Sequence, residues 1–220
     1  MPSSETSQTS LQLPAIQPNR WPTTDQLVAS GMLPSSLQQM LVDLILDRKN
    51  ILITGPQGTG KTALLKALLD HVPDEERLFI IDHDDDLPML KKALLENSYH
   101  RVVMMEIRTG VDYLLLQAAA NDNSGVLATL QAESVSDALD WLTKISMSAA
   151  PPSPHTDPFC TQDGMPYVDN IICCELGAGG KPQISEVVSV RGFSHDDQQF
   201  ITKDLYCGGE DEHFTSPEGL

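Results

Sequence analysis

A glycine-rich stretch in the first third of the chain has the residue types of a phosphate-binding loop. The sequence GPQGTGKT fits the spacing G-x-x-x-x-G-K-[ST], with an apolar run before it and an amphipathic stretch after it. Backbone N–H groups of such a loop curl around a phosphate, which glycine permits because it adopts φ > 0 readily. We therefore expect this stretch to bind ATP and Mg²⁺, through Gly55, Pro56, Gln57, Gly58, Thr59, Gly60, Lys61 and Thr62.

Two side chains of this loop have expected roles. Lys61 would reach the β- and γ-phosphates, and the Thr62 hydroxyl would bind Mg²⁺. The helix that follows would direct its positive end at the anion. The alternative is a glycine-rich turn between a strand and a helix that binds no ligand.

Hydrolysis would also need a carboxylate near the γ-phosphate to polarise water and to contact the metal. The sequence RVVMMEIRTG ends an apolar run with Glu106 and then Arg108. A carboxylate at the C-terminal tip of a strand beside the phosphate-loop strand would lie where water and metal bind, whereas the alternative is an ordinary strand-end charge. A second acidic group, IIDHDDDL, includes Asp82 and Asp86. A solvated turn is the alternative for any one aspartate, but we expect at least one of the group to face metal or water.

Short apolar runs alternate with amphipathic stretches and must position these residues. The predicted strands are at 50–55, 77–82, 101–107 and 125–131, and the predicted helices follow them at 60–72, 87–97, 110–122 and 134–148. Repeated strand–helix units imply a parallel sheet with helices on both faces. Further apolar runs predict antiparallel strands near the C-terminal end, at 167–176, 182–193 and 198–206. The predicted fold class is α/β, with a mostly parallel sheet.

The composition along the chain predicts one domain between two tails. Residues 1–20 are rich in Ser, Thr, Gln and Pro and predict a disordered tail. Residues 21–206 predict the domain, with two leading helices within 21–49. Residues 207–220 predict a disordered acidic end.

The charge balance argues against a nucleic-acid ligand. The chain has 31 acidic and 14 basic residues among 220, and a formal net charge of −17, which would repel a phosphate backbone. The acidity serves solubility or favours a basic protein partner. No apolar run is long enough to span a bilayer and no secretory signal opens the sequence, so we expect a cytoplasmic protein.

Three segments resemble, in order, the motifs of one family. LVASGMLPSSLQQMLVDLILDRKNILITGPQGTGKTALLKALL is similar to the leading helices and Walker A segment of the traffic ATPases of type II and type IV secretion, conjugation and pilus systems. RLFIIDHDDDL is similar to their acidic box, and HRVVMMEIRTGVDYLLLQAAANDNSGVLATLQAESVSDALDWL to their Walker B strand and histidine boxes. The nearest likeness is to the conjugation and type IV secretion members. The resemblance implies a RecA-like P-loop core, secretion-apparatus proteins or a related ATPase as partners, and a place at the cytoplasmic face of the inner membrane.

The resemblance also implies roles for single residues. Glu106 and Arg108 match the Walker B glutamate and its following arginine, and Asp82 and Asp86 stand where the acidic-box glutamates fall. Gln131 stands where the second histidine box has its histidine, as Asn123 does in the first box. The implied catalytic set is Glu106, Asp86 and Gln131, the implied Mg²⁺ ligands are Thr62, Glu106 and Asp82, and Arg108 contacts the nucleotide. Because Gln and Asn cannot carry the positive charge of histidine, we expect slow hydrolysis.

Three functions stay open at this point. The first is an ATPase of a secretion, conjugation or pilus-type apparatus, and the second is a non-enzymatic nucleotide-binding subunit that docks on such a machine. The third is a small P-loop kinase, which phosphate transfer to a small acceptor would support. The family usually carries a separate N-terminal domain that helps to close a ring, and only a tail and two helices precede the phosphate loop here. We therefore expect weak or partner-dependent oligomers.

Overall fold

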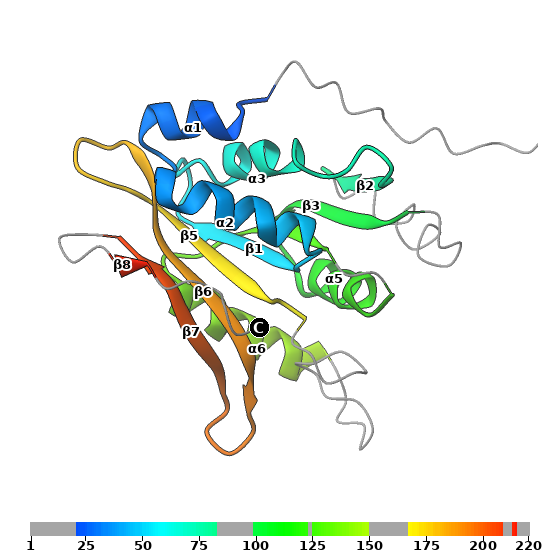
Figure 1. Ribbon diagram of the computed structural model, residues 1–220. Helices are drawn as coiled ribbons and strands as arrows, with labels where there is room; N and C mark the ends of the chain where they lie inside the picture. The colour runs from blue at the N-terminus through cyan, green and yellow to red at the C-terminus, as the bar shows by residue number, and fades with distance from the viewer. Residues whose placement is uncertain (1–20, 83–98, 123–124, 150–166, 209–212, 215–220) are drawn as a thin grey trace, which may run out of the picture.

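A mixed sheet forms the centre of the protein (Figure 1). The computed structural model describes residues 21–82, 99–122, 125–149, 167–208 and 213–214. Within these residues the strands form one eight-stranded sheet in the order β2-β3-β4-β1-β5-β6-β7-β8. Strands β2, β3, β4, β1 and β5 are parallel, and β6, β7 and β8 continue the sheet antiparallel. Their bounds are Ile51–Gly55 for β1, Leu78–Ile81 for β2, Arg101–Ile107 for β3, Leu127–Gln131 for β4, Asn170–Leu176 for β5, Pro182–Ser194 for β6, Gln199–Cys207 for β7 and His213–Phe214 for β8.

Helices cover both faces of the parallel part of the sheet, as Figure 1 shows. Helices α1, α2 and α3 cover one face, and α5 and α6 cover the other. Their bounds are Thr24–Ser30 for α1, Ser35–Leu46 for α2, Lys61–Leu69 for α3, Gly110–Asp122 for α5 and Val135–Ala149 for α6. No helix in the described part of the chain is both long and apolar enough to cross a membrane.

Strand β1 shows why the sheet needs cover on both sides. All of its residues are buried. Ile51 and Ile53 pack in the apolar cluster under α1, α2 and α3, and Leu52 packs in the cluster formed with α5 and α6. Successive side chains of a strand point to opposite faces, so an unbroken apolar run buries both faces of this strand. The predicted α/β fold with a mostly parallel sheet is confirmed.

Some predicted segments lie outside the described residues, and the predicted C-terminal tail is partly ordered. The helix predicted over 87–97 lies outside the described residues, as do residues 1–20. The segment predicted as a disordered end contributes the last residue of β7 and the short strand β8, which pairs Tyr206 with Phe214 and Cys207 with His213. A two-residue strand has no periodicity that a sequence pattern could detect, and only its pairing with β7 makes it a strand.

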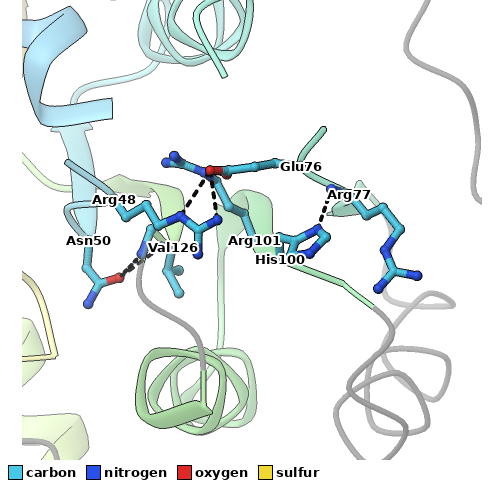
Figure 2. Close-up of polar contacts among 8 residues, drawn as sticks. Arg48, Asn50, Glu76, Arg77, His100, Arg101 and Val126 are labelled. Atoms are coloured by element: carbon cyan, nitrogen blue, oxygen red, sulfur yellow. Dashed lines mark hydrogen bonds and ion pairs between the residues drawn. The ribbon is translucent and has the colours of Figure 1, made fainter. Parts of the chain in front are cut away.

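A partly buried ion-pair group lies at the N-terminal end of the parallel strands (Figure 2). The Arg101 side chain is fully buried and its Nε donates to Oε2 of Glu76. Glu76 also accepts from Arg48, whose Nε lies 2.9 Å from Oε1. Burial by itself would raise the pKa of Glu76, but the hydrogen bonds and charges of the two arginines outweigh it and hold this pKa below its usual value. The group therefore ties the start of β3 to the turn before β2.

Candidate functional site

The predicted phosphate loop is the turn between β1 and α3, and it needs its glycines for two different reasons. Gly55 has φ of +143°, and a β-carbon at this position would lie 2.1 Å from the carbonyl oxygen of Cys174 on β5. Gly58 and Gly60 have φ of +82° and +85°. Residues with a β-carbon rarely adopt such angles. The loop therefore needs glycine at Gly55 for a close backbone approach and at the other two positions for their left-handed conformation.

Helix α3 begins directly after this loop. Gly60 is its N-cap and has no side chain to satisfy the N–H groups of the first turn. No acidic residue lies in that turn, and Lys61 and Thr62 open the helix. The positive end of the helix dipole and the unsatisfied N–H groups together make this helix start suitable for an anion.

The Lys61 ammonium group is folded back onto the loop. Its Nζ donates to the carbonyl oxygens of Gly55 and Pro56, at 2.7 Å each, and only 9% of the residue is exposed. Burial lowers the pKa of Lys61, whereas the nearby Cys174 and Glu106 act to raise it. A phosphate that replaced these carbonyls would give the ammonium an anionic partner in place of neutral ones.

A cavity of about 680 Å³ opens over the loop and the C-terminal ends of several strands. Its size is within the usual range for small-molecule sites. Strand order brings its walls together: β4 lies between β1 and β3, and Gln131 at the end of β4 pairs with Gly55. The lining residues are Gln57, Gly58, Gly60, Lys61, Thr62, Ala63, Asp82, Met105, Glu106, Arg108, Thr129 and Gln131.

The carboxylate predicted at the end of β3 lies in this cavity and is ion-paired. Arg108 Nε is 2.8 Å from Glu106 Oε2. Asp112, which is buried, accepts hydrogen bonds from the backbone N–H groups of Arg108 at 2.9 Å and Thr109 at 2.8 Å. The start of α5 thus holds the backbone that follows Glu106, as a capping residue does at a helix N-terminus.

The structure brings most of the predicted site residues together. Nine of them line the cavity, namely Gln57, Gly58, Gly60, Lys61, Thr62, Asp82, Glu106, Arg108 and Gln131. Gly55, Pro56 and Thr59 support the loop instead of lining the cavity, since the carbonyls of Gly55 and Pro56 accept from Lys61 and the Thr59 hydroxyl donates to Pro56. Asp86 lies outside the described residues, as does Asn123.

Three lining residues were not predicted: Ala63, Met105 and Thr129. The Thr129 hydroxyl donates to the carbonyl oxygen of Met105 and so joins β4 to β3 below the cavity. The alternation of side chains along a strand could have indicated Thr129, because it lies two residues before Gln131 and therefore on the same face of β4. It could be used only once the neighbouring strands were known.

Comparison with known proteins bears on the family. The sequence model of the family described as "Type II/IV secretion system protein" matches residues 1–87, which include α1, α2 and the phosphate loop. The type IV secretion system protein VirB11 of Bartonella henselae is 28% identical over 120 residues, which is 44% of this chain and 34% of VirB11. The probable conjugal transfer protein TrbB of Sinorhizobium fredii is 23% identical over 210 residues, which is 86% of this chain and 62% of TrbB. This chain is related to the type II/IV secretion ATPases.

The fold of this chain is similar to that of a solved secretion ATPase. The crystal structure of the VirB11 ATPase from the Brucella suis type IV secretion system, in complex with sulphate, matches with a TM-score of 0.54 and 21% identity. The match covers 73% of this chain and 53% of that structure. The predicted RecA-like core is thereby confirmed as a fold. The chain spans about a third of the length of VirB11 (34%) and about three-fifths of the length of TrbB (62%).

Proposed function

We propose that this chain binds Mg²⁺-ATP at the cavity over its phosphate loop and hydrolyses it slowly as a subunit of a type IV secretion, conjugation or pilus-type apparatus. One observation carries the proposal. The phosphate loop, the carboxylate of Glu106 and the amide of Gln131 line the same cavity at the C-terminal ends of neighbouring strands. Ligands of open α/β sheets bind at such strand ends.

The residues of the cavity fit a nucleotide triphosphate and its metal. The glycine-rich loop and the start of α3 offer N–H groups to the phosphates, and Lys61 offers an ammonium group. Thr62 is exposed on the cavity wall, with the carboxylates of Asp82 and Glu106 also in the lining. A hydroxyl and one or two carboxylates are what a protein usually contributes to Mg²⁺, which takes its other ligands from water and phosphate. The related Brucella suis ATPase was solved with sulphate, an anion with the tetrahedral shape of phosphate.

Within the proposed reaction each side chain has one task. Glu106 orients water and accepts its proton, Gln131 donates a hydrogen bond from its amide, and Lys61 neutralises phosphate charge. Bound Mg²⁺ would supply further neutralisation of the phosphates. Asp82 would help to hold the metal, and Asp86 is proposed from the sequence alone as a further catalytic carboxylate.

Slow turnover follows from the residue at the end of β4. Gln131 supplies a neutral amide where a histidine could supply a charge, and the loss of one such contact can lower a rate about 10²- to 10³-fold without loss of binding. The same residue favours the second candidate, a nucleotide-binding subunit without turnover that docks on a secretion machine. Under either function we propose a basic face on the partner, because the chain carries a net charge of −17. We place the protein on the cytoplasmic side of the inner membrane through such partners.

Binding and turnover measured on the same samples test the proposal. Calorimetric titration with Mg²⁺-ATP should detect binding to the wild type, and Lys61→Ala should weaken it by about tenfold or more, because hydrogen bonds to charged groups contribute about 1.5–3 kcal/mol. Lys144→Ala is the matched control, since Lys144 is exposed on α6 and does not line the cavity. Equal ATP affinity of the wild type and Lys61→Ala would overturn the proposed site.

Steady-state phosphate release then separates the two candidates. Slow Mg²⁺-dependent release supports an ATPase, and binding without release supports the non-enzymatic subunit. Transfer of phosphate to a small acceptor would instead support the kinase.

A further inference from the structure

Arg108 is ion-paired with Glu106 and lines the proposed nucleotide cavity. We propose that Arg108 exchanges partners: without nucleotide it is bonded to Glu106, and in the presence of a nucleoside triphosphate it turns to the γ-phosphate and releases the Glu106 carboxylate. This inference rests on the proposed nucleotide site. It makes Arg108 the residue that distinguishes a triphosphate from a diphosphate and that couples this recognition to the carboxylate needed for hydrolysis.

The geometry of the end of β3 supports an exchange within the cavity. Arg108 and Glu106 both line it, and the guanidinium Nε lies 2.8 Å from Glu106 Oε2. The register of β3 against β4 shifts between Met104 and Ile107, so Glu106 stands at an irregular position of the strand end. Such irregular positions often redirect a side chain next to a binding site.

The pair is exposed enough to be replaced. The side chains are 53% exposed for Arg108 and 37% exposed for Glu106. Ion pairs with this exposure contribute little, because water competes for both partners. A phosphate carries more charge than one carboxylate and accepts two parallel hydrogen bonds from a guanidinium. A phosphate group that reached Arg108 would therefore compete well against Glu106.

The backbone beneath Arg108 is fixed, so only its side chain needs to move. Asp112 is 4% exposed and accepts from the backbone N–H of Arg108 and of Thr109. The Thr109 hydroxyl in turn accepts from the backbone N–H of Asp112 at 3.3 Å. These reciprocal bonds hold the turn before α5 in one place, so an exchange can occur by rotation of the Arg108 side chain alone.

Lys61 lies on the loop itself, so its proposed contact with the phosphates does not duplicate a contact made from the segment after β3. Its ammonium group donates to the carbonyls of Gly55 and Pro56. Among the described residues that line the cavity, Lys61 and Arg108 are the two cationic ones. Arg108 directly follows β3, which ends at Ile107, and so approaches the cavity from a different segment of the chain than the loop does.

The affinity ratio of triphosphate to diphosphate tests the exchange. Calorimetry would compare the non-hydrolysable β,γ-imido analogue of ATP with ADP, each with Mg²⁺. Arg108→Gln should weaken the analogue about tenfold and ADP less than twofold, because only the analogue has a γ-phosphate for a charged hydrogen bond. Arg108→Lys should give an intermediate ratio, since lysine keeps the charge but loses the planar fork.

Arg191→Gln is the matched control for charge. Arg191 is exposed on β6, two residues beyond Ser189, which pairs with Asn170 at the start of β5. It therefore lies at the opposite end of the sheet from the phosphate loop, and its substitution should leave the ratio unchanged. If Arg191→Gln changed the affinity ratio as much as Arg108→Gln does, the loss of any positive charge would explain the effect, and the proposal would be overturned.

A double-mutant cycle tests the exchange itself. Glu106→Gln removes the competitor for Arg108, so it should strengthen binding of the analogue a few-fold more than binding of ADP. This additional gain should disappear when Arg108 is also glutamine. If it persists, the two residues do not compete and the inference is overturned.

The inference and the proposed function fail in different ways. If the wild type binds neither nucleotide, the nucleotide site itself is wrong. If the wild type binds both but Arg108→Gln weakens them equally, the site stands and the γ-phosphate role is overturned. Thermal unfolding without nucleotide checks that each variant is folded. If Arg108→Gln is not folded, the affinity ratio of Arg108→Lys is used for the test instead.

Discussion

Replacement of Gly55 by alanine should be far more damaging than the same change at Gly58, although both glycines belong to the phosphate loop. A β-carbon at Gly55 would lie 2.1 Å from the carbonyl oxygen of Cys174 and 2.9 Å from the Thr59 hydroxyl oxygen. A β-carbon at Gly58 would have no atom within 4 Å. Both positions have positive φ, of +143° and +82°, so both substitutions strain the backbone, but only the alanine at Gly55 also collides with neighbouring atoms.

The magnitude follows from these two costs. An alanine at Gly55 adds about 1–3 kcal/mol for its sparsely populated backbone conformation. The displacement of the loop from β5 adds about 1–3 kcal/mol, by analogy with overpacked cores. We therefore expect Gly55→Ala to lower the free energy of unfolding by about 2–6 kcal/mol. Gly58→Ala should lower it by about 1 kcal/mol, the cost of a left-handed alanine.

Urea titration followed by circular dichroism measures both changes, with wild type and variants at one protein concentration. A chain of this size loses about 2–4 °C of Tm per kcal/mol, so Gly55→Ala should also melt roughly 4–24 °C below the wild type. Equal midpoints for Gly55→Ala and Gly58→Ala would refute the reasoning, because the loop would then not rest on the backbone of β5.

Four further outcomes are expected. Glu106→Gln should abolish phosphate release while ATP still binds, because an amide orients water but cannot accept its proton; release at the wild-type rate in a phosphate-release assay would show that another group is the base. Glu76→Gln should destabilise the fold by about 2–3 kcal/mol, since it removes the charge that pairs with the buried Arg101, and exposed Glu75→Gln should change stability little in the same urea titration. Because the pKa of Glu76 is held below its usual 4.5, its contribution is present above that value and lost as the pH falls through the lowered pKa, which unfolding midpoints from roughly pH 6 to pH 3 would reveal. The protein should be mainly monomeric at low salt without nucleotide, because its net charge of −17 opposes self-association; a stable hexamer in light scattering at micromolar protein would contradict this.

Local sequence patterns determined the elements of this fold. The predicted strand over 101–107 and the predicted helix over 110–122 coincide with β3 and α5, because apolar runs and helical periodicity depend on neighbouring residues only. The phosphate loop could also be predicted from local sequence, since its glycines, Lys61 and Thr62 all lie in the short stretch from the end of β1 to the start of α3. These features need no knowledge of where the rest of the chain goes.

Contacts between distant segments were decided by the tertiary structure alone. The sequence does not say that β4 lies between β1 and β3, and it is this order that pairs Gln131 with Gly55 and brings Thr129 and Met105 under the cavity. It also does not say that Arg101, a charged residue at a strand start, is fully buried against Glu76.

The partners of the reactive side chains depend on the same long-range order. Lys61 donates to two loop carbonyls and Arg108 is bonded to Glu106, and neither contact follows from residue types or spacing. The physical reason is that short-range preferences fix the conformation of a segment, whereas strand pairing and side-chain contacts are fixed by the packing of many segments at once. The sequence therefore determined which residues could bind a phosphate, and the tertiary structure decided which of them meet in one cavity.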